Sequence, residues 1–549
     1  MANTKITSRV IADNSVGIDA LNVTDGTNGQ ALTTDGSGTL SFSTISGGAS
    51  DINGLSDAKT FGTSSIMLGD ATTGTIDGAN YNTGVGIDVF AALTSGDRNV
   101  AIGTSALAAN TTGADNVALG YRSSYISTTG NQNTGLGFQT LYNATASNNT
   151  AVGASVLENN TTGANNTALG TQALQGNTTA SNNTAVGYFA LVANTTGTYN
   201  VAVGKSALAA NTASNNTALG YQALDANTTG AFNVAVGTST MGANTTGSNN
   251  VAMGVDALVA NTTGGLNTAL GTSALAANTT AFDNAAVGYQ SLLSNTTGSG
   301  NTALGTSALA LNTTASNNTA VGAAALLANT TGTLNTAVGA QALRTTTTGN
   351  YNTAMGRHAL YANTTGSYNT AYGIDAGAAI TTGQFNLTLG TDAGLSYSPS
   401  GSITTQSDII CLGANTITNA YIKVAWTVTS DKRDKTDIEP LRMGLNFVNE
   451  LEPVTYKWDM RSDYEDGKPD GTHKKENLQG GLLAQDVEEL ERAYGYKVED
   501  NTAILTDKNA DGNYGLTYSK FIPVLINAVQ ELSAKCDSLQ NEINILKGD

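Results

Sequence analysis

The stretch Asn99–Asp115, NVAIGTSALAANTTGAD, recurs with small changes along most of this 549-residue chain. Its glycine, Gly103, is one of 20 glycines spaced regularly from Gly69 to Gly390. Of the 19 intervals between these glycines, 17 are 17 residues long and two are 16 residues long. A period this constant indicates a repeat architecture, in which each unit packs mainly on its two neighbours.

Each unit fixes the residue type at a few positions relative to this repeat glycine. Asn lies four positions before it in every unit except the first, which has Ser65. An aliphatic residue lies one position before it except at Tyr372, and Leu lies four positions after it in most units, as at Leu107. Low-complexity disorder is the alternative for a sequence so rich in Asn, Thr and Gly, but disorder does not preserve apolar positions.

The residues just before the repeat glycine predict a short β-strand, because their side chains alternate and turn residues flank them. A 17-residue unit is too short for a helical hairpin repeat. The next segment, SALAAN at residues 105–110, fits either a second strand or a single helical turn. We therefore predict a mainly β solenoid over residues 61–395, with an Asn ladder and with Gly at tight turns.

The apolar residues of each coil are few and small, so one chain would have a thin core of mostly Ala, Val and Leu. This favours several copies packing side by side, and we expect a homotrimer. An ice-binding solenoid is a further alternative for a Thr-rich repeat. However, most Thr pairs lie in NTTG turns and not in a Thr-x-Thr file along a strand.

The repeat resembles the left-handed β-roll of trimeric autotransporter adhesin heads, whose repeats centre on a similar SVAIG-like strand. The resemblance covers about residues 60–395 and implies a trimeric shaft. No signal peptide or membrane-anchor barrel of such adhesins is recognisable, so the resemblance indicates architecture and not adhesin function.

The composition changes at Ser430. Residues 1–429 carry 9 basic and 18 acidic side chains, whereas residues 430–549 carry 15 basic and 24 acidic side chains. We therefore expect a separate domain over residues 430–549. Residues 396–429 alternate apolar side chains and contain Trp426, which suggests a distal β tip. Residues 1–60 are turn-rich, resemble the starts of phage fibre proteins, and are predicted to attach the protein to a virion.

Three motifs follow one another in residues 430–549: SDKRDKTDIEPL from Ser430, GGLLAQDVEEL from Gly480 and YGLTYSKFIPVL from Tyr514. In this order they resemble the self-cleaving intramolecular chaperone domain at the C-terminus of phage tailspikes and fibres of the endosialidase type. The chain departs from the family pattern at Asp437, where the family often has Asn. The pattern itself falls on Ser430, Asp431, Arg433, Lys435, Gly481, Ala484, Gln485 and Tyr518.

The resemblance implies one self-cleavage between Thr429 and Ser430, with Ser430 as nucleophile and Lys435 as base of a Ser-Lys dyad, and no enzyme with turnover. Asp431 and Arg433 would hold the loop. A neutral lysine can activate a serine, and burial favours neutral lysine, so we expect Lys435 to be shielded in the assembled protein. Helical positions five apart lie about 140° apart, so the pair requires a turn or neighbouring subunits.

The C-terminal segment predicts a helix with an apolar residue at every third or fourth position. This spacing is typical of a coiled-coil seam, and a trimeric bundle fits the family. The alternative is an amphipathic helix packed on its own domain. The seam comprises Ile522, Leu525, Val529, Leu532, Cys536, Leu539, Ile543 and Leu546.

Composition also excludes several classes of partner and site. A net charge of −18 argues against nucleic-acid binding. No apolar run reaches the roughly 18 residues of a membrane span, and the absence of a secretory signal leads us to expect synthesis in a cytoplasm. The two cysteines, Cys411 and Cys536, form no disulfide framework. We expect no cofactor.

Two weak metal signals have structural alternatives. Residues 507–512, DKNADG, match the opening of an EF-hand calcium loop, but Tyr518 stands where the loop needs a bidentate Glu. A hairpin turn at Asp511-Gly512 explains the same residues. His358 and His473 are single and far apart, so no metal site is expected.

Together these features predict a homotrimeric phage tail fibre that is made in the host cytoplasm and resides in the virion. It would bind a virion tail or baseplate protein through its N-terminus and a receptor on the host cell surface. One alternative is a bacterial surface adhesin-like structural protein with the same chaperone domain. Another is a polysaccharide-degrading tailspike, which would need paired carboxylates, yet Glu158 is the only Glu before residue 430.

Overall fold

A computed structural model describes residues 30–34, 40–44, 58–69, 78–396, 398–417, 420–421, 423, 429–461, 464, 467–509 and 512–548. The chain divides into two compact units, residues 1–284 and 285–549. Trp426, Asp511 and most of the predicted N-terminal attachment segment lie outside the described residues.

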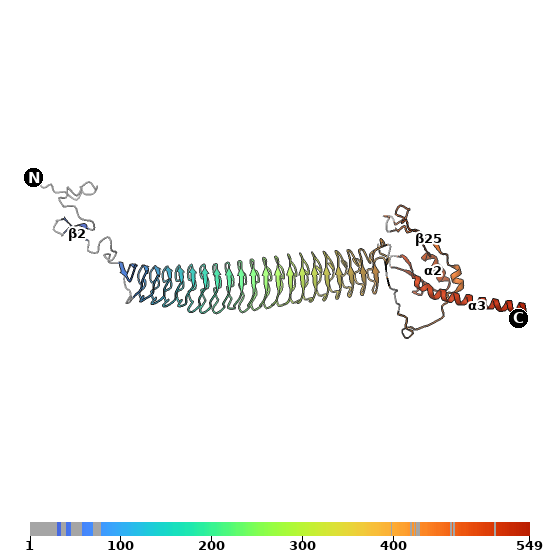
Figure 1. The fold of residues 1–549 in the computed structure, drawn as a ribbon, viewed down its shortest axis with the longest axis horizontal. Helices are drawn as coiled ribbons and strands as arrows, with labels where there is room; N and C mark the ends of the chain where they lie inside the picture. The colour runs from blue at the N-terminus through green and yellow to red at the C-terminus, as the bar shows by residue number, and fades with distance from the viewer. Residues whose placement is uncertain are drawn as a thin grey trace. The chain divides into compact units, whose positions relative to one another are not determined.

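The first unit is an array of parallel strands (Figure 1). An antiparallel hairpin, β1 with β2, precedes it, and β3 pairs antiparallel with β4. From β4 onward, each strand pairs in parallel with the next one along the chain. The strands are β1 (Gln30–Thr34), β2 (Leu40–Thr44), β3 (Ala58–Phe61), β4 (Ser65–Leu68), β5 (Thr83–Val85), β6 (Val100–Ile102), β7 (Val117–Leu119), β8 (Thr134–Leu136), β9 (Thr150–Val152), β10 (Thr167–Leu169), β11 (Thr184–Val186), β12 (Val201–Val203), β13 (Thr217–Leu219), β14 (Val234–Val236), β15 (Val251–Met253) and β16 (Thr268–Leu270).

The second unit contains further coils of the same kind and then a small α+β region. Its parallel strands run to β24, which lies within the segment predicted as the tip. They are β17 (Ala285–Val287), β18 (Thr302–Leu304), β19 (Thr319–Val321), β20 (Thr336–Val338), β21 (Thr353–Met355), β22 (Thr370–Tyr372), β23 (Leu387–Leu389) and β24 (Ile410–Leu412). The α+β region consists of η4 (Lys432–Asp434), α1 (Leu445–Glu450), β25 (Val454–Tyr456), β26 (Gln479–Gly481), α2 (Ala484–Ala493), β27 (Thr506–Lys508), β28 (Tyr514–Leu516), η6 (Tyr518–Lys520) and α3 (Phe521–Lys547). The predicted mainly β solenoid with 17-residue coils, followed by an α+β region that ends in a helix, is confirmed.

The Asn four positions before each repeat glycine forms a buried ladder. Asn250 donates from Nδ2 to the Gly264 carbonyl (2.9 Å), and its Oδ1 accepts the backbone N–H of Asn267 in the next coil (3.0 Å). Its own backbone N–H donates to Oδ1 of Asn233 in the preceding coil (3.0 Å). Because the amide is paired on both sides, it can be buried at little cost and still fix the register of adjacent coils.

A second buried Asn ladder runs beside the first, and the sequence had suggested only turns there. Its members are the Asn residues of the NTTG segments. Asn261 donates from Nδ2 to Oδ1 of Asn244 (2.8 Å) and to the Gly264 carbonyl (2.9 Å). Gly264 therefore joins the two ladders. A Cβ at Gly264 would lie 2.3 Å from the Ala281 carbonyl oxygen, so an alanine at this position would require the next coil to shift.

The SALAAN segment is neither a strand nor a helical turn. Ser105 and Leu107 take left-handed conformations, with φ of 59° and 48°. The Ser105 N–H donates to Ile87 of the preceding coil (2.8 Å), and the Leu107 N–H donates to Ser123 of the next coil (3.1 Å). A left-handed residue other than glycine costs about 1–2 kcal/mol. Burial of the Leu107 side chain and bonding to both neighbouring coils offset this cost.

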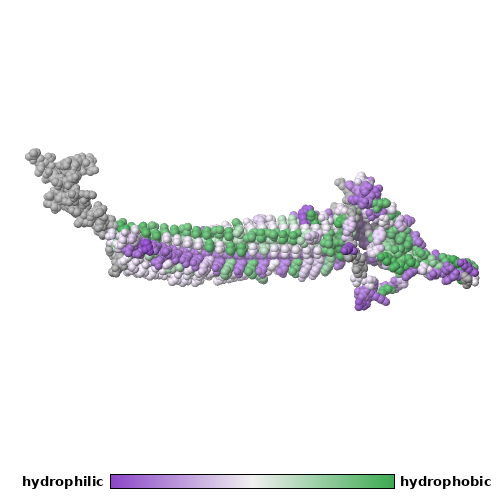
Figure 2. All heavy atoms as spheres, in the orientation of Figure 1, coloured by the Kyte–Doolittle hydropathy of each residue, from purple (hydrophilic) through white to green (hydrophobic). Residues whose placement is uncertain are grey.

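The core of a coil is narrower than predicted. The Ala two positions before the repeat glycine and the Leu four positions after it are fully buried, as at Ala168 and Leu174. Val and Leu one position before the glycine point outward, and Leu169 and Leu219 are each 47% exposed. These outward residues form apolar rows along the coils, and Figure 2 shows hydrophobic residues gathered in rows on the coils.

The α+β region has its own apolar core. Met443, Phe447, Val487, Leu505, Phe521 and Val524 pack together, bringing α1, α2 and α3 onto one cluster. Within α3, the buried residues are Phe521, Val524 and Ala528. These lie off the predicted seam, so the helix binds its own region through one face near its start.

Candidate functional site

The loop Ser430–Lys435 folds back on itself around the short helix η4. Asp431 caps this turn, because its Oδ1 accepts the backbone N–H of Arg433 (2.9 Å). The Lys435 N–H donates to the Lys432 carbonyl (3.3 Å), which closes the turn at its other end. The turn thus returns Lys435 to the start of the loop.

Ser430 and Lys435 meet within this single loop. The Nζ of Lys435 donates to the Oγ of Ser430 at 2.6 Å. Thr429, Ser430 and Lys435 are all exposed in the single chain, so the peptide bond at the predicted cleavage point is accessible. A hydrogen bond between a serine hydroxyl and a lysine amine is one contact that proton transfer in a Ser-Lys pair needs.

Asp431 and Arg433 pair across the turn. The Nε of Arg433 lies 3.1 Å from both carboxylate oxygens, and its Nη2 lies 2.6 Å from Oδ2. These side-chain bonds, and then the Arg433 backbone N–H, hold the pKa of the Asp431 carboxyl below its usual value. The same pair raises the pKa of Arg433. The pair therefore acts on the shape of the loop and does not touch the Ser430 hydroxyl.

Asp437, the departure from the family pattern, has a left-handed backbone with φ of 49°. Asn and Asp are the side chains that most readily adopt this conformation after glycine. Exchanging Asn for Asp at this position therefore suits the same backbone.

The second and third motifs meet each other at β26 and η6. The Tyr518 hydroxyl accepts the backbone N–H of Leu482 at 3.0 Å. A Cβ on Gly481 would lie 2.6 Å from that hydroxyl oxygen, so glycine makes room for the tyrosine. Ala484 and Gln485 begin α2 directly after this contact. Among the described residues, no hydrogen bond or ion pair joins this contact to Ser430 or Lys435.

Sequence reasoning missed a buried carboxylate, Glu491, on α2. Its side chain accepts the backbone N–H groups of Ile504 (2.8 Å), Leu505 (2.7 Å) and Thr506 (2.9 Å), and also the Thr506 hydroxyl. It therefore clamps α2 to the start of β27. A glutamate in a charged helical segment usually faces solvent, so only its position opposite a strand start could have indicated this role.

The predicted seam of α3 is exposed in the single chain. Ile522, Val529 and Leu532 face solvent, as do Leu539 and Ile543 further along. Glu531 and Asn527, on another face, fix α1 through the Leu445 N–H (2.7 Å) and the Met443 carbonyl (2.9 Å). The helix thus presents an apolar stripe that its own region does not cover.

The described part of the chain has no group of three or more His, Cys, Asp or Glu side chains that could hold a metal ion. Strands β27 and β28 form an antiparallel hairpin, while Asp511, in its predicted turn, lies outside the described residues. No helix among the described residues is long and apolar enough to cross a membrane.

Comparison with protein families finds one match, in the C-terminal region. Residues 430–501 match the model of the family described as chaperone of endosialidase. Within the C-terminal region, this segment is therefore similar to the endosialidase chaperones. The match begins at Ser430, the first residue of the loop described above. No curated protein and no solved structure matches the chain. The endosialidase-chaperone region and the β-solenoid together indicate a fibre- or tailspike-like structural protein.

Proposed function

We propose that this protein is a homotrimeric phage tail fibre for host attachment, assembled by its C-terminal chaperone, which then cleaves the chain between Thr429 and Ser430. The observation that carries the proposal is the match to the endosialidase chaperones, which begins at Ser430, C-terminal to the repeats. Ser430 acts as nucleophile and Lys435 as base, and Asp431 with Arg433 shapes the loop.

A repetitive shaft needs such a chaperone because its coils are nearly equivalent. If three copies align with a slip of 17 residues, most contacts between them are recreated. The free-energy gap between the right and the wrong register is then small. A non-repetitive domain at one end sets a unique offset, and the apolar stripe of α3 supplies a seam for three helices.

Cleavage then makes assembly irreversible in practice. Once the chaperone has left, the shaft no longer carries the element that aligned it, so unfolding and refolding become slow. In the same proposal, residues 1–60 attach to a virion tail or baseplate protein, residues 61–395 form the shaft, residues 396–429 form the tip, and the host receptor binds the mature fibre.

The test is denaturing electrophoresis with mass spectrometry of the wild-type chain and of Ser430→Ala. We expect a mature product ending at Thr429 from the wild type and only full-length chain from the variant. Ser533→Ala, an exposed serine on α3, is the control and should cleave as the wild type does. Full-length wild-type chain in a preparation that already forms trimers would refute the cleavage assignment.

A bacterial surface adhesin-like structural protein with the same chaperone is the second candidate. Its support is the resemblance of the coils to adhesin-head β-rolls. Immunogold labelling separates the two candidates. Label on purified phage particles supports the fibre, and label on the envelope of uninfected cells supports the adhesin-like protein.

A further inference from the structure

The outward side chains of the coil strands form a surface that carries no charge. In each of the 20 strands from β4 to β23, the residue two positions before the repeat glycine is buried, while the residues three and one positions before it point to the opposite side. We call these 40 outward positions the strand face. Twelve of them hold Thr, 27 hold an apolar residue and one holds Tyr372. The strand face therefore contains no Asn, Gln or Ser and no ionisable group besides Tyr372.

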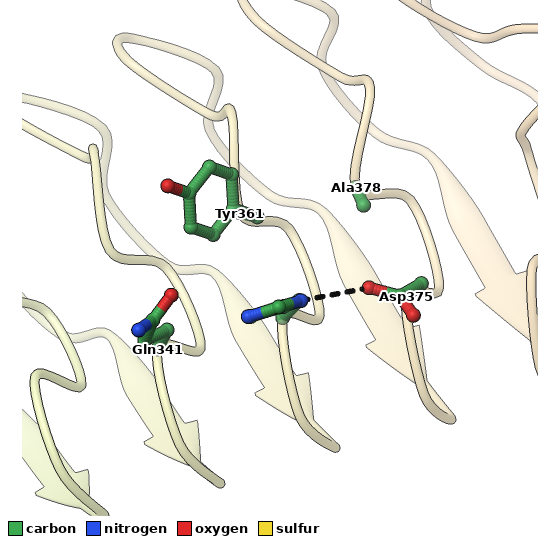
Figure 3. Close-up of a pocket in the computed structure, with 5 residues that line it drawn as sticks. Gln341, Tyr361, Asp375 and Ala378 are labelled. Carbon is green, nitrogen blue, oxygen red and sulfur yellow. Dashed lines mark hydrogen bonds and ion pairs between the residues drawn. The ribbon is translucent and has the colours of Figure 1, made fainter.

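The charged side chains of the coils lie on other surfaces. None of the 14 Asp, Glu, Lys and Arg residues from Asp88 to Asp392 is on the strand face, and 10 of them lie one, two or five positions after a repeat glycine. Figure 3 shows Gln341, Tyr361 and Asp375 at these latter positions, on the segments that follow the glycine and not on the strands. One surface of the coils thus bears charges and the other bears none.

The strand face is open in the single chain. Leu304 is 47% exposed and Met253 is 50% exposed. With strands about 4.8 Å apart and three residues of about 3.3 Å each, every strand adds roughly 50 Å² to this face, or about 1,000 Å² over the 20 strands. The largest apolar patch of a typical monomer covers about 300–600 Å², whereas a stable protein interface covers about 800 Å² on each partner. The strand face therefore has the area of a protein interface.

A second copy of this chain fits the strand face better than another partner does. The apolar rows repeat once per coil, about every 4.8 Å, and a second copy carries rows with the same spacing. A foreign protein is selected through charged and polar groups at particular places, and the strand face offers no charge for this. Binding to a membrane surface is strengthened by Lys and Arg, but the coils from Asp88 to Asp392 carry five basic and nine acidic residues.

We propose that copies of the chain pack together through the strand face, so that these faces meet inside the shaft and the charged surfaces lie outside. The inference rests on the proposed homotrimeric fibre and names the surface through which its shafts associate. Packed sheets lie about 10 Å apart, so the side chains one position before the glycine interdigitate with those of a neighbouring copy. Because the strand face is nearly uniform, it supplies binding without a unique register, and the register is left to the chaperone.

The test measures distances between copies in the full-length Ser430→Ala chain, in which the chaperone stays attached. Cys536→Ala removes the exposed cysteine, and Cys411 is buried, so a new cysteine carries the only spin label. Pulsed EPR gives the distance between labels on neighbouring copies, and a water-soluble relaxation agent reports the accessibility of each label. Sedimentation velocity on the same samples reports the oligomer.

Each unit of the chain provides a matched pair of label sites. In the first unit, Leu219→Cys lies on the strand face, and Thr229→Cys is an exposed site off that face. In the second unit, Leu304→Cys and Thr314→Cys form the same pair. We expect the strand-face labels of neighbouring copies to lie closer together, and to be less accessible to the relaxation agent, than the labels at the two threonines. Loss of the oligomer only on labelling the strand face would support the same conclusion.

The possible failures can be told apart. Strand-face labels that are far apart and accessible in a trimeric protein would overturn the inference and leave the proposed trimer standing. Labels that are far apart but shielded would show that another molecule covers the strand face, which also overturns the inference. If the Ser430→Ala chain with both native cysteines is a monomer, the trimer of the proposed function fails together with this inference.

Discussion

The Nζ of Lys435 lies 2.6 Å from the Oγ of Ser430 within one six-residue loop. If Lys435 is the base, Lys435→Met should slow cleavage by at least about 100-fold, because the serine hydroxyl then loses its proton acceptor. The measurement is the fraction of cleaved chain over time on a denaturing gel. Lys432→Met, in the same loop but without a bond to Ser430, should cleave normally. Equal rates in the two variants would contradict the dyad.

The Asp431–Arg433 pair predicts a pH dependence of the loop. Because the folded loop lowers the pKa of Asp431, its carboxylate contributes stability above the ordinary value of about 3.9. That contribution is lost as the pH falls through the lowered value. A carbon-detected NMR titration should place the midpoint of Asp431 below about 3.9. In Arg433→Gln the midpoint should move upward only part of the way, since the backbone N–H bond remains. An unmoved midpoint would show that the guanidinium does not set it.

Gly481 and Tyr518 should behave as a coupled pair. Gly481→Ala should destabilise the chaperone region by about 1–3 kcal/mol, because the new Cβ would crowd the Tyr518 hydroxyl. Tyr518→Phe should cost about 1 kcal/mol through loss of the bond from Leu482. In the double variant the alanine should cost clearly less than it does alone. Urea unfolding followed by Trp458 fluorescence measures all three, and strictly additive costs would argue against the contact.

The Glu491 clamp predicts a large loss of stability. Glu491→Ala would leave three backbone N–H groups in a buried position without their acceptor, at a cost of about 3 kcal/mol or more. Glu491→Gln keeps one acceptor oxygen and should cost less. Glu489→Ala, an exposed glutamate on the same helix, should change the free energy of unfolding by less than about 0.5 kcal/mol. If Glu489→Ala and Glu491→Ala changed the free energy of unfolding by similar amounts, the stabilising role of Glu491 would be refuted.

The exposed stripe of α3 predicts an assembly defect that leaves the fold of the chaperone region intact. Leu532→Asp should abolish the trimer, because Leu532 is exposed in the single chain and a charge in the seam would be buried only on association. Sedimentation velocity on the Ser430→Ala background reports the oligomer. Ser533→Asp, one residue off the seam, should remain trimeric. A trimeric Leu532→Asp protein would place the interface elsewhere.

The repeat allowed most of the shaft to be derived from sequence, because a constant period with Asn and Gly at fixed places leaves few possible architectures. The second Asn ladder was not predicted, because Asn110 and Asn261 lie in NTTG segments, whose composition is typical of turns. The left-handed backbone conformation of the leucines four positions after the repeat glycine was not predicted either. Local propensity disfavours Leu107 at positive φ, and only bonding between coils overrides that preference.

In the chaperone region, the order of the three motifs located the loop of Ser430 and Lys435. The pairing of Gly481 with Tyr518 required the structure, because the two residues lie 37 positions apart in the sequence. Glu491 could not have been found from pattern alone. Its helix is amphipathic with or without that carboxylate, and the four groups that donate to Glu491 come from a segment that sequence cannot place against it.

The coils change length at two places without loss of the Asn ladder, namely at the NTTG corner and, in the last coil, in the segment before that corner. In the two 16-residue intervals Thr-Ala replaces Thr-Thr-Gly, and the ladder amides of Asn133 and Asn200 bond instead to the carbonyls of Ala146 (2.9 Å) and Ala213 (2.8 Å). The last coil reaches Gly413 after 23 residues, and its extra residues lie before the corner, between Gly394 and Ile403, whose N–H donates to the Gly394 carbonyl (2.9 Å). Asn386 still bonds to Gln406 (2.9 Å). We therefore expect the segment between Gly394 and Ile403, and not the NTTG corner, to accept foreign peptides for display while the ladder bonds beside it persist.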